Sequence, residues 1–244
     1  MTKYLFYIGI ISLALISCSR DEGPTPDFGY NYFPEQQGAF IVYDVDSIYY
    51  DEFNNSVDTF KFQLKEKVES FFYDNENRKT MRIERYIKNF NPSIPYSSMP
   101  WTLKNIWMAN KTTKTAEKVE ENIRYIKLVF PVKDAQVWNG NAQNTLDQWN
   151  YMYAFIDRKR TIGNTTFDSV LQVTQFDDKQ QNLVQHQYYI ELYARNIGLI
   201  YKRVIDVKSQ PGSPIPPNFF QTPIMQRITS GLQYTMTYNS SGTE

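Results

Sequence analysis

This sequence has little cysteine, histidine or glycine and no excess of charge. Among 244 residues there are one Cys, one His, 10 Gly, 26 Lys and Arg, and 26 Asp and Glu. A single cysteine excludes an internal disulfide. With only one histidine beside it, the chain has no Cys/His set for zinc, so no metal site is expected. A formal net charge of zero argues against a nucleic-acid-binding protein, because such proteins need a basic surface to neutralise phosphates.

Groups that catalysis commonly uses are scarce as well. His186 is the only imidazole and is expected to be packed or at a sheet edge, and no G-x-S-x-G nucleophile elbow is present. Phosphate-binding glycine loops and a D-x-D-x-D-G calcium loop are missing. Asp44 and Asp46 share a face of an expected strand, where solvent-facing carboxylates are ordinary. We therefore expect that the protein is not an enzyme and holds no cofactor.

The first 17 residues have the pattern of a signal peptide that ends at a lipidation site. Lys3 precedes a largely apolar run, 5–16, which is too short to span a bilayer comfortably. Leu15-Ile16-Ser17-Cys18 resembles the bacterial lipobox. The resemblance implies cleavage before Cys18 and acylation of that residue, for example with palmitate. Several acyl chains hold a protein firmly to a leaflet, because each buried CH₂ contributes about 0.8 kcal/mol.

The residues after Cys18 combine charge and proline. Ser19-Arg20-Asp21-Glu22 resembles the surface-export signal of Bacteroidota lipoproteins, which implies an outer-membrane protein facing the cell exterior. Gly23-Pro24-Thr25-Pro26 favours an extended, semi-rigid chain, so 18–34 is expected to be a tether. The alternatives are an ordinary secretory signal with a chance cysteine and a polar tether with accidental charges.

From residue 35 to about 240 apolar and polar residues alternate, which predicts strands with one face on a core. The alternation is clearest in 41–49, 60–72, 81–88 and 232–238, and further strand candidates are 100–110, 122–130, 151–157, 166–176, 186–195 and 198–207. We interpret 111–122 as a strand or hairpin and 141–150 as a short helix or a loop. The fold class is therefore all-β, a single antiparallel domain over 35–240. A lipocalin-like barrel, a strongly bent sheet and a sandwich all fit the pattern.

Two motifs within 125–207 resemble a family of surface-exposed outer-membrane lipoproteins of Bacteroidota without an assigned activity. The first is Phe130-Pro131-Val132 followed by Trp138-Asn139-Gly140-Asn141-Ala142, and the second reads E-L-Y-A-R-N-I-G-L-I-Y-K over 191–202. The resemblance implies a surface lipoprotein and no particular catalytic residue.

Local chemistry favours a structural role for both motifs. Asn196 and Gly198 tolerate positive φ and are expected to turn strand 186–195 into strand 198–207. At the other motif Gly140 is expected to let the chain reverse while Trp138 is buried, and both asparagines are expected to bond local backbone. The alternative is that Trp138, Asn139 and Asn141 line a small polar pocket.

Two short patterns point to modification and to surface binding. Asp46-Ser47-Ile48 and Asp168-Ser169-Val170 resemble the O-glycosylation sequon of the same phylum, which implies exposed hydroxyls on Ser47 and Ser169. Aromatic residues make up 16% of the chain. Adjacent rings such as Tyr49-Tyr50 point to opposite faces of a strand, so some rings are available to sugars or protein partners unless the core is two-sided.

Three functions are compatible with these observations. The first is a non-catalytic accessory subunit of an outer-membrane transport or assembly complex, with an integral outer-membrane protein as partner. The second is a lipid-anchored module that binds a glycan or a lipid, and the third, least supported, is a glycosidase-type enzyme. An exposed apolar patch without a cavity favours the first, a concave pocket with converging polar groups the second, and two carboxylates in a cleft the third.

Overall fold

The described part of the chain, residues 25–179 and 181–244 of a computed structural model, forms one antiparallel sheet. Its strands lie in the order β6-β5-β4-β3-β2-β1-β12-β11-β10-β9-β8-β7. Their bounds are β1 Ala39–Asp51, β2 Ser56–Tyr73, β3 Lys79–Asn89, β4 Thr102–Lys111, β5 Thr115–Glu120, β6 Ile123–Val129, β7 Val137–Asn139, β8 Asn150–Ile162, β9 Thr165–Asp177, β10 Gln185–Ala194, β11 Gly198–Lys208 and β12 Ser230–Thr243. Four 3-10 turns lie outside the strands: η1 Tyr30–Tyr32 before β1, η2 Tyr96–Ser98 between β3 and β4, and η3 Phe219–Gln221 and η4 Ile224–Gln226 between β11 and β12.

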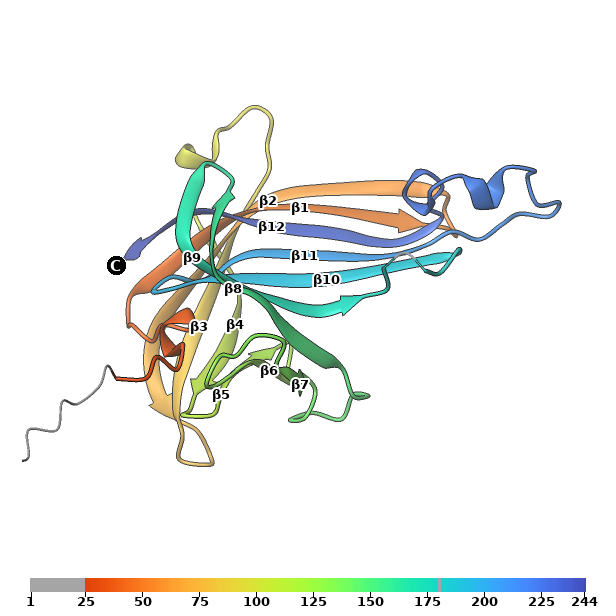
Figure 1. Cartoon of the computed structure of the whole chain (residues 1–244). Coiled ribbons are helices and arrows are strands. Elements are labelled where there is room, and N and C mark those ends of the chain that lie inside the picture. The colour runs from red at the N-terminus through yellow and green to blue at the C-terminus, as the bar shows by residue number, and fades with distance from the viewer. Residues whose placement is uncertain (1–24, 180) are drawn as a thin grey trace, which may run out of the picture.

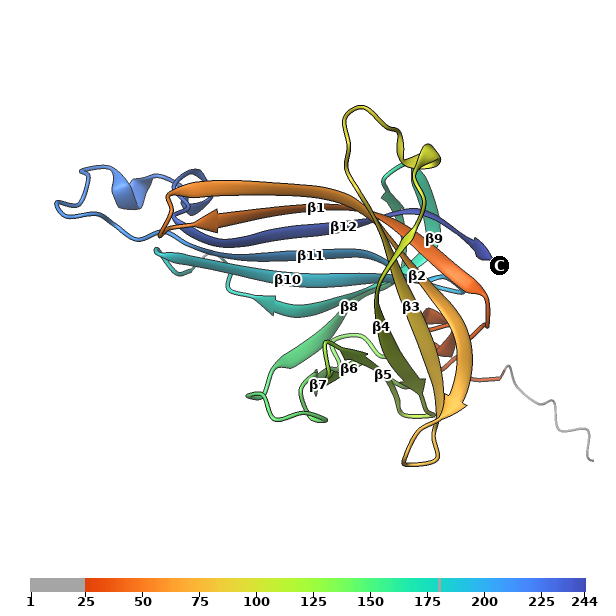
Figure 2. The same ribbon diagram turned by 180° about the vertical axis from the view of Figure 1, so that it is seen from behind.

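The sheet curls until its two outer strands nearly meet. Because β1 pairs with β12, the halves β1–β6 and β7–β12 extend in opposite directions from this central pair. Figures 1 and 2 show the result, a barrel-like sheet from which β1, β2, β10, β11 and β12 extend to one side. The prediction of a single antiparallel β domain is confirmed, and a continuous, nearly closed sheet takes the place of the sandwich alternative.

The gap between β6 and β7 is closed mainly by side chains, and we call it the seam. Ile126 N donates to the carbonyl of Gly140 at 2.9 Å, and Trp138 Nε1 donates to the carbonyl of Ile126 at 2.9 Å. The Tyr153 hydroxyl bonds both the N–H and the C=O of Val129, each at 2.8 Å. These contacts satisfy backbone groups of β6 that a free sheet edge leaves open to pairing with other chains.

A cluster of aromatic and aliphatic side chains packs behind the seam. Its buried members are Tyr32, Ala116, Ile126, Leu128, Phe130, Trp138, Tyr151, Tyr153, Leu171, Val173 and Tyr193. A second cluster joins the central strands and consists of Tyr43, Val45, Leu64 and Met236. Residues in these clusters occupy the apolar register of the alternating pattern, so burial of one strand face explains why the pattern predicts the strands.

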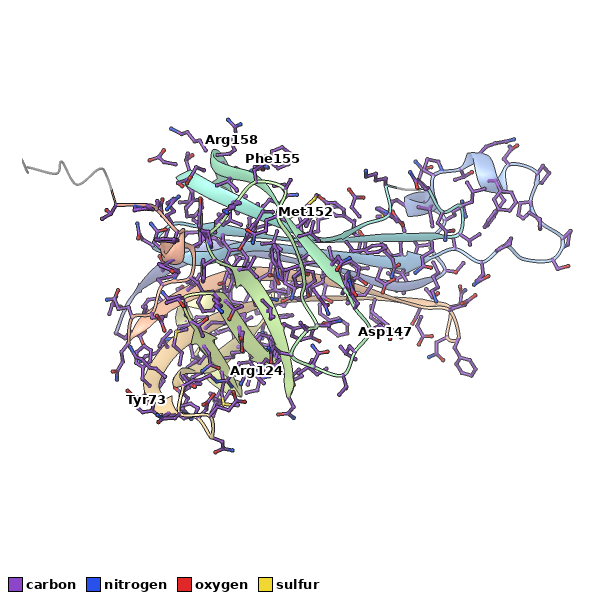
Figure 3. All side chains as sticks on the ribbon, turned by 60° about the horizontal axis from the view of Figure 1, so that its bottom comes forward. Tyr73, Arg124, Asp147, Met152, Phe155 and Arg158 are labelled. Carbon is purple, nitrogen blue, oxygen red and sulfur yellow. The ribbon has the colours of Figure 1, made fainter. Side chains whose placement is uncertain are left out.

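β8 bends sharply in its middle. Its register with β9 moves from Ala154↔Gln172 to Arg158↔Val170, and Phe155 and Asp157 have positive φ of 52° and 53°. Figure 3 labels Met152, Phe155 and Arg158 along this strand, on the outside of the molecule. The bend turns the second half of the β8–β9 hairpin away from the seam.

The predicted strands are present, but several are longer than predicted: β8 continues to Ile162 and β12 to Thr243, where the predictions end at 157 and 238. The segment 111–122 contains β5 in a hairpin, which agrees with one of its two interpretations, and 141–149 forms turns and coil, which agrees with the loop alternative. β7 is an additional short strand of three residues that alternation does not reveal. A run of three residues is too short to show a period of two.

The N-terminal part of the described chain packs on the barrel. From the expected tether 18–34, residues 25–28 are exposed, whereas Gly29 is buried and Tyr32 is fully buried. The predicted signal peptide 1–17, the lipidation site Cys18 and the export signal 19–22 lie outside the described residues. Within the described ranges, no helix is long and apolar enough to cross a membrane.

Candidate functional site

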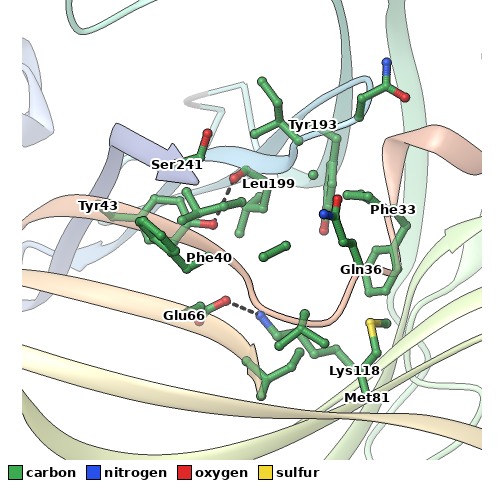
Figure 4. Close-up of a pocket in the computed structure, with 18 of the residues that line it drawn as sticks. Phe33, Gln36, Phe40, Tyr43, Glu66, Met81, Lys118, Tyr193, Leu199 and Ser241 are labelled. Carbon is green, nitrogen blue, oxygen red and sulfur yellow. Dashed lines mark hydrogen bonds and ion pairs between the residues drawn. The ribbon is translucent and has the colours of Figure 1, made fainter. Parts of the chain in front are cut away.

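A cavity of about 270 Å³ opens at the end of the barrel where the described chain begins, which we call the tether end. The tether end comprises residues 33–41, the turn 194–198 and residues 241–243, and Figure 4 shows the cavity inside it. The apolar lining includes Phe33, Pro34, Phe40, Ile41, Val68, Met81, Ile83 and Leu199. Charged side chains also line it, namely Glu66, Lys118, Glu120 and Lys127.

The β10–β11 turn shapes one side of the cavity. Asn196 has φ of 63° and Gly198 has φ of 101°, as the sequence predicts for this turn. A side chain at Gly198 would be strained by that φ, and the turn places the Leu199 carbonyl where it accepts a 2.9 Å bond from the Tyr43 hydroxyl. This bond ties the turn to β1 across the opening.

A first group of buried charges centres on Lys127. Its Nζ lies 2.7 Å from Glu191 Oε1 and 3.3 Å from Glu120 Oε1, and Lys202 Nζ lies 3.4 Å from Glu191. The side chains of Lys127 and Glu191 are only 4% and 1% exposed. Burial acts to lower the pKa of Lys127, but the attraction of Glu120 and Glu191 outweighs it and raises that pKa. Lys127 is therefore charged at neutral pH.

A second group centres on Glu66. This carboxylate lies 2.9 Å from Arg85 Nε and 2.7 Å from Lys118 Nζ. The ring of Trp107 lies 3.4 Å from the Arg85 guanidinium and 4.8 Å from Lys118 Nζ. Burial acts to raise the pKa of Glu66, but Lys118 and Arg85 outweigh it and lower that pKa. Two cations therefore share one ionised carboxylate at the wall of the cavity.

A cluster of polar side chains holds residues 27–33 against the barrel. These residues include Phe33, which lines the cavity. Arg195 bonds Asp157 with two nitrogens, at 2.6 and 2.8 Å, and Asn31 Oδ1 at 2.8 Å. The hydroxyls of Tyr32 and Ser169 also donate to Asp157. The hydrogen bond from Arg195 is the main reason why the pKa of Asp157 lies well below its usual range. The bent part of β8, the β10–β11 turn and η1 are thus joined in one network.

The W-x-G-N-A motif builds the seam and does not line the cavity. Asn139 Oδ1 accepts from the N–H groups of Asn141 and Trp149, both at 3.0 Å, and Trp138 is buried. The backbone bonds predicted for the asparagines are present. Gly140 lies in a turn in which Ala142 N donates to the Asn139 carbonyl at 3.3 Å. Its φ is not positive, and glycine is required there by close approach, because a Cβ would come within 2.4 Å of the Tyr151 ring.

The two serines of the sequon-like tripeptides are half-buried. Ser47 lies within β1 between Phe60 of β2 and Tyr234 of β12. Ser169 lies in β9, and its hydroxyl belongs to the network of Asp157 and Arg195. Glycosylation of either serine stays a prediction.

No metal-binding set is present within residues 25–179 and 181–244, where three or more His, Cys, Asp or Glu side chains nowhere gather suitably. His186 is buried, with Nδ1 at 2.8 Å from Asp178 Oδ1, as expected for a packed histidine.

Sequence reasoning missed the charged residues of the cavity, although a signal was present. In β2 the inward positions read Phe62, Leu64, Glu66 and Val68, so a glutamate occupies the apolar register. Glu191 lies in a fully buried stretch of β10 between Ile190 and Leu192. Charged side chains that point into a protein are almost always paired with an opposite charge. A charged residue among inward-facing positions therefore indicates that oppositely charged groups meet inside the barrel at that point of the strand.

No family model matches the chain, and no curated protein matches it either. Two solved structures show a weak overall similarity to it. One is a Bacteroides fragilis protein described as exported and YmcC-like in fold, with a TM-score of 0.44 and 9% identity over 86% of this chain and 98% of that one. The other is a Parabacteroides distasonis protein described as a lipoprotein, with a TM-score of 0.36 and 12% identity over the same shares. Likeness at this level carries no argument about the function of the present chain.

Proposed function

We propose that this protein is a lipid-anchored, non-catalytic module of the outer membrane whose barrel binds a small amphiphile. The observation that carries the proposal is the cavity of about 270 Å³, with apolar walls and four charged side chains among its lining residues. Ligand sites in proteins are concave and mostly apolar, with a few polar groups that fix orientation. The lipobox-like sequence at Cys18 supports the anchor, and the charged residues 19–22 support an exterior position.

Ligand binding predicts a local response at Met81, which lines the cavity. In the protein labelled with ¹³C at its methionine methyl groups, n-decanoate added below its micelle concentration is expected to shift the Met81 resonance until it saturates. Met152, which lies exposed on β8, is the internal control. A Met81 signal that stays in place, or one that moves only together with Met152, contradicts binding in the cavity.

A second candidate function, an accessory subunit that binds a protein partner, is favoured by the opposite end of the sheet. The turn between β1 and β2 lies far from the tether end in Figures 1 and 2. Phe53 is 96% exposed there, and Tyr49 and Phe60, on one face of the β1–β2 pair, are 47% and 55% exposed. Neighbouring exposed apolar side chains of this kind mark interaction surfaces more often than isolated ones do. An integral outer-membrane protein with a projecting domain is the partner we propose.

The partner proposal predicts the result of a mild-detergent purification of the tagged protein from outer membranes. An integral membrane protein is expected to accompany the unchanged chain stoichiometrically. The variant with Phe53→Ser and Phe60→Ser is expected to recover at least about tenfold less of it, because aromatic anchors dominate interface energies. Phe155→Ser, an equally exposed ring on β8, is the matched control. Recovery of the tagged chain alone argues against a stable partner.

A further inference from the structure

The cavity has a direction, with its charges deep and its apolar side chains nearer the mouth. Along the β2–β3 pair the register runs from Glu66↔Arg85 to Val68↔Ile83 and then to Phe71↔Met81, moving towards the tether end. On the opposite wall it runs from Glu191↔Lys202 to Tyr193↔Leu199 and then to the turn at Gly198. A ligand that matches both walls therefore places its polar head inside and its apolar part at the mouth.

The deep charges of the two walls carry a net positive charge. Three carboxylates meet four cations there, namely Glu66, Glu120 and Glu191 with Arg85, Lys118, Lys127 and Lys202. Lys118 also lines the cavity, and its side chain is 10% exposed. A desolvated site with one cation more than it has carboxylates favours a further anion, since an ionised hydrogen-bond partner is worth more there than in water.

We propose that the ligand is a single-chain amphiphile with a carboxylate head, which binds head first beside Lys118 and leaves its alkyl chain at the mouth. This inference rests on the proposed binding function and names its ligand class. A volume of about 270 Å³ is slightly below the usual range of pockets for drug-sized molecules, about 300–1,000 Å³, which suits one short chain better than a two-chain lipid.

The position of the mouth identifies the source of such a ligand. Pro34 and Gln36 line the cavity, so the segment that leads back to the lipidation site also forms the rim. Thr25, where the described chain begins, lies only seven positions after Cys18, a span of at most about 25 Å. The mouth of an acylated protein therefore lies close to the leaflet that holds its anchor, from which a fatty acid can pass directly.

Calorimetric titration with three ten-carbon probes tests the head group. We expect n-decanoate to bind more tightly than decanol and decyltrimethylammonium. Lys118→Gln is expected to weaken decanoate binding by about 10- to 100-fold, the worth of a hydrogen bond to a charged group, and to leave decanol unchanged. Glu66 keeps Arg85 as partner in that variant, and thermal unfolding checks its fold. Lys104→Gln, outside the cavity, is the matched control and should bind as the unchanged protein does.

Blocking the mouth provides a second, independent variant. Ser241 lines the cavity, whereas Ser240 is its neighbour on the other face of β12 and pairs with Val42. Ser241→Trp is expected to abolish decanoate binding, and Ser240→Trp is expected to retain it. If decanoate and decanol bind equally well and Lys118→Gln weakens both alike, the cavity binds amphiphiles but the carboxylate assignment is wrong. If no probe binds, the proposed function itself is wrong.

Vesicles loaded with decanoate distinguish the two sources of the ligand. The acylated protein reconstituted in such vesicles is expected to carry more decanoate than the Cys18→Ala protein added from solution at the same total concentration. If the two proteins carry equal amounts of decanoate, the leaflet is not the source of the ligand, and the ligand comes from the aqueous phase.

Discussion

Replacement of Lys127 by methionine is expected to lower the free energy of unfolding by about 3–5 kcal/mol, the usual cost of breaking a buried ion pair from one side. Lys127 Nζ is the nearest cation to Glu191, at 2.7 Å, and also pairs with Glu120. Without it, the two buried carboxylates keep only the longer ion pairs with Lys202, at 3.4 and 3.8 Å. Urea unfolding at neutral pH, followed by tryptophan fluorescence, measures the loss.

Two further variants separate the buried charge from other effects of the substitution. Lys159→Met removes an exposed pair with Asp168 at 3.4 Å and is expected to cost less than about 1 kcal/mol. Adding Glu191→Gln to Lys127→Met is expected to restore much of the lost stability, because it removes the uncompensated charge and keeps an acceptor for the Tyr193 hydroxyl. A loss below about 1 kcal/mol in Lys127→Met, or no recovery in the double variant, contradicts this role of the ion pairs.

The pH dependence of the difference follows from the carboxyl pKa values. In the unchanged protein burial acts to raise the pKa of Glu191, but Lys127 and Lys202 outweigh it, so that pKa lies below its ordinary value. A lowered pKa contributes stability that is present above the unfolded-state value, about 4.3, and is lost as the pH falls. In the variant the unpaired carboxyl binds a proton more readily. The stability difference between the two proteins is therefore expected to shrink in acid.

The strands could be predicted from sequence because one rule governs most of them. Residues such as Tyr43, Val45 and Leu64 alternate with polar neighbours since one face of each strand packs inward. A charged residue that breaks this alternation indicates the position of the site. Glu66 stands where the alternation requires an apolar side chain, yet a single strand does not reveal that Lys118, 52 positions later, lies opposite it. The partner of a buried charge is set by strand order, and alternation carries no information about strand order.

The closure of the sheet could not be predicted from local sequence patterns either. The pairing of β1 with β12 joins residues about two hundred positions apart, such as Ala39 and Thr243. Once that pair forms, β6 and β7 become the two outer strands and must meet or remain open. Burial of Trp138 could be predicted from its neighbours, but its bond to the Ile126 carbonyl depends on this distant closure. Local motifs therefore predict turns, whereas the seam and the cavity depend on topology.

Replacement of Trp138 by alanine is expected to open the seam and to cost about 3–5 kcal/mol, the usual range for deleting a buried aromatic side chain. The Trp138 ring packs on Tyr151 and Tyr153, with centroids 5.9 and 4.5 Å away, and its Nε1 donates to the Ile126 carbonyl. The substitution leaves a void in the cluster behind the seam and an unpaired carbonyl on β6. Chemical unfolding measures the loss of stability.

A second readout tests the seam itself. An exposed strand edge pairs with other chains, so the Trp138→Ala protein is expected to dimerise or aggregate in size-exclusion chromatography while the unchanged protein does not. Trp138→Phe keeps most of the packing and loses only the hydrogen bond, so a smaller cost of about 1–3 kcal/mol is expected. Trp101→Ala, which removes a half-exposed ring beside Lys88, is the matched control and should leave the elution unchanged. If Trp138→Ala elutes like the Trp101→Ala control although it is less stable, the Trp138 ring fills the core but does not protect the strand edge. The remaining contacts of Ile126 and Val129 would then keep the seam closed.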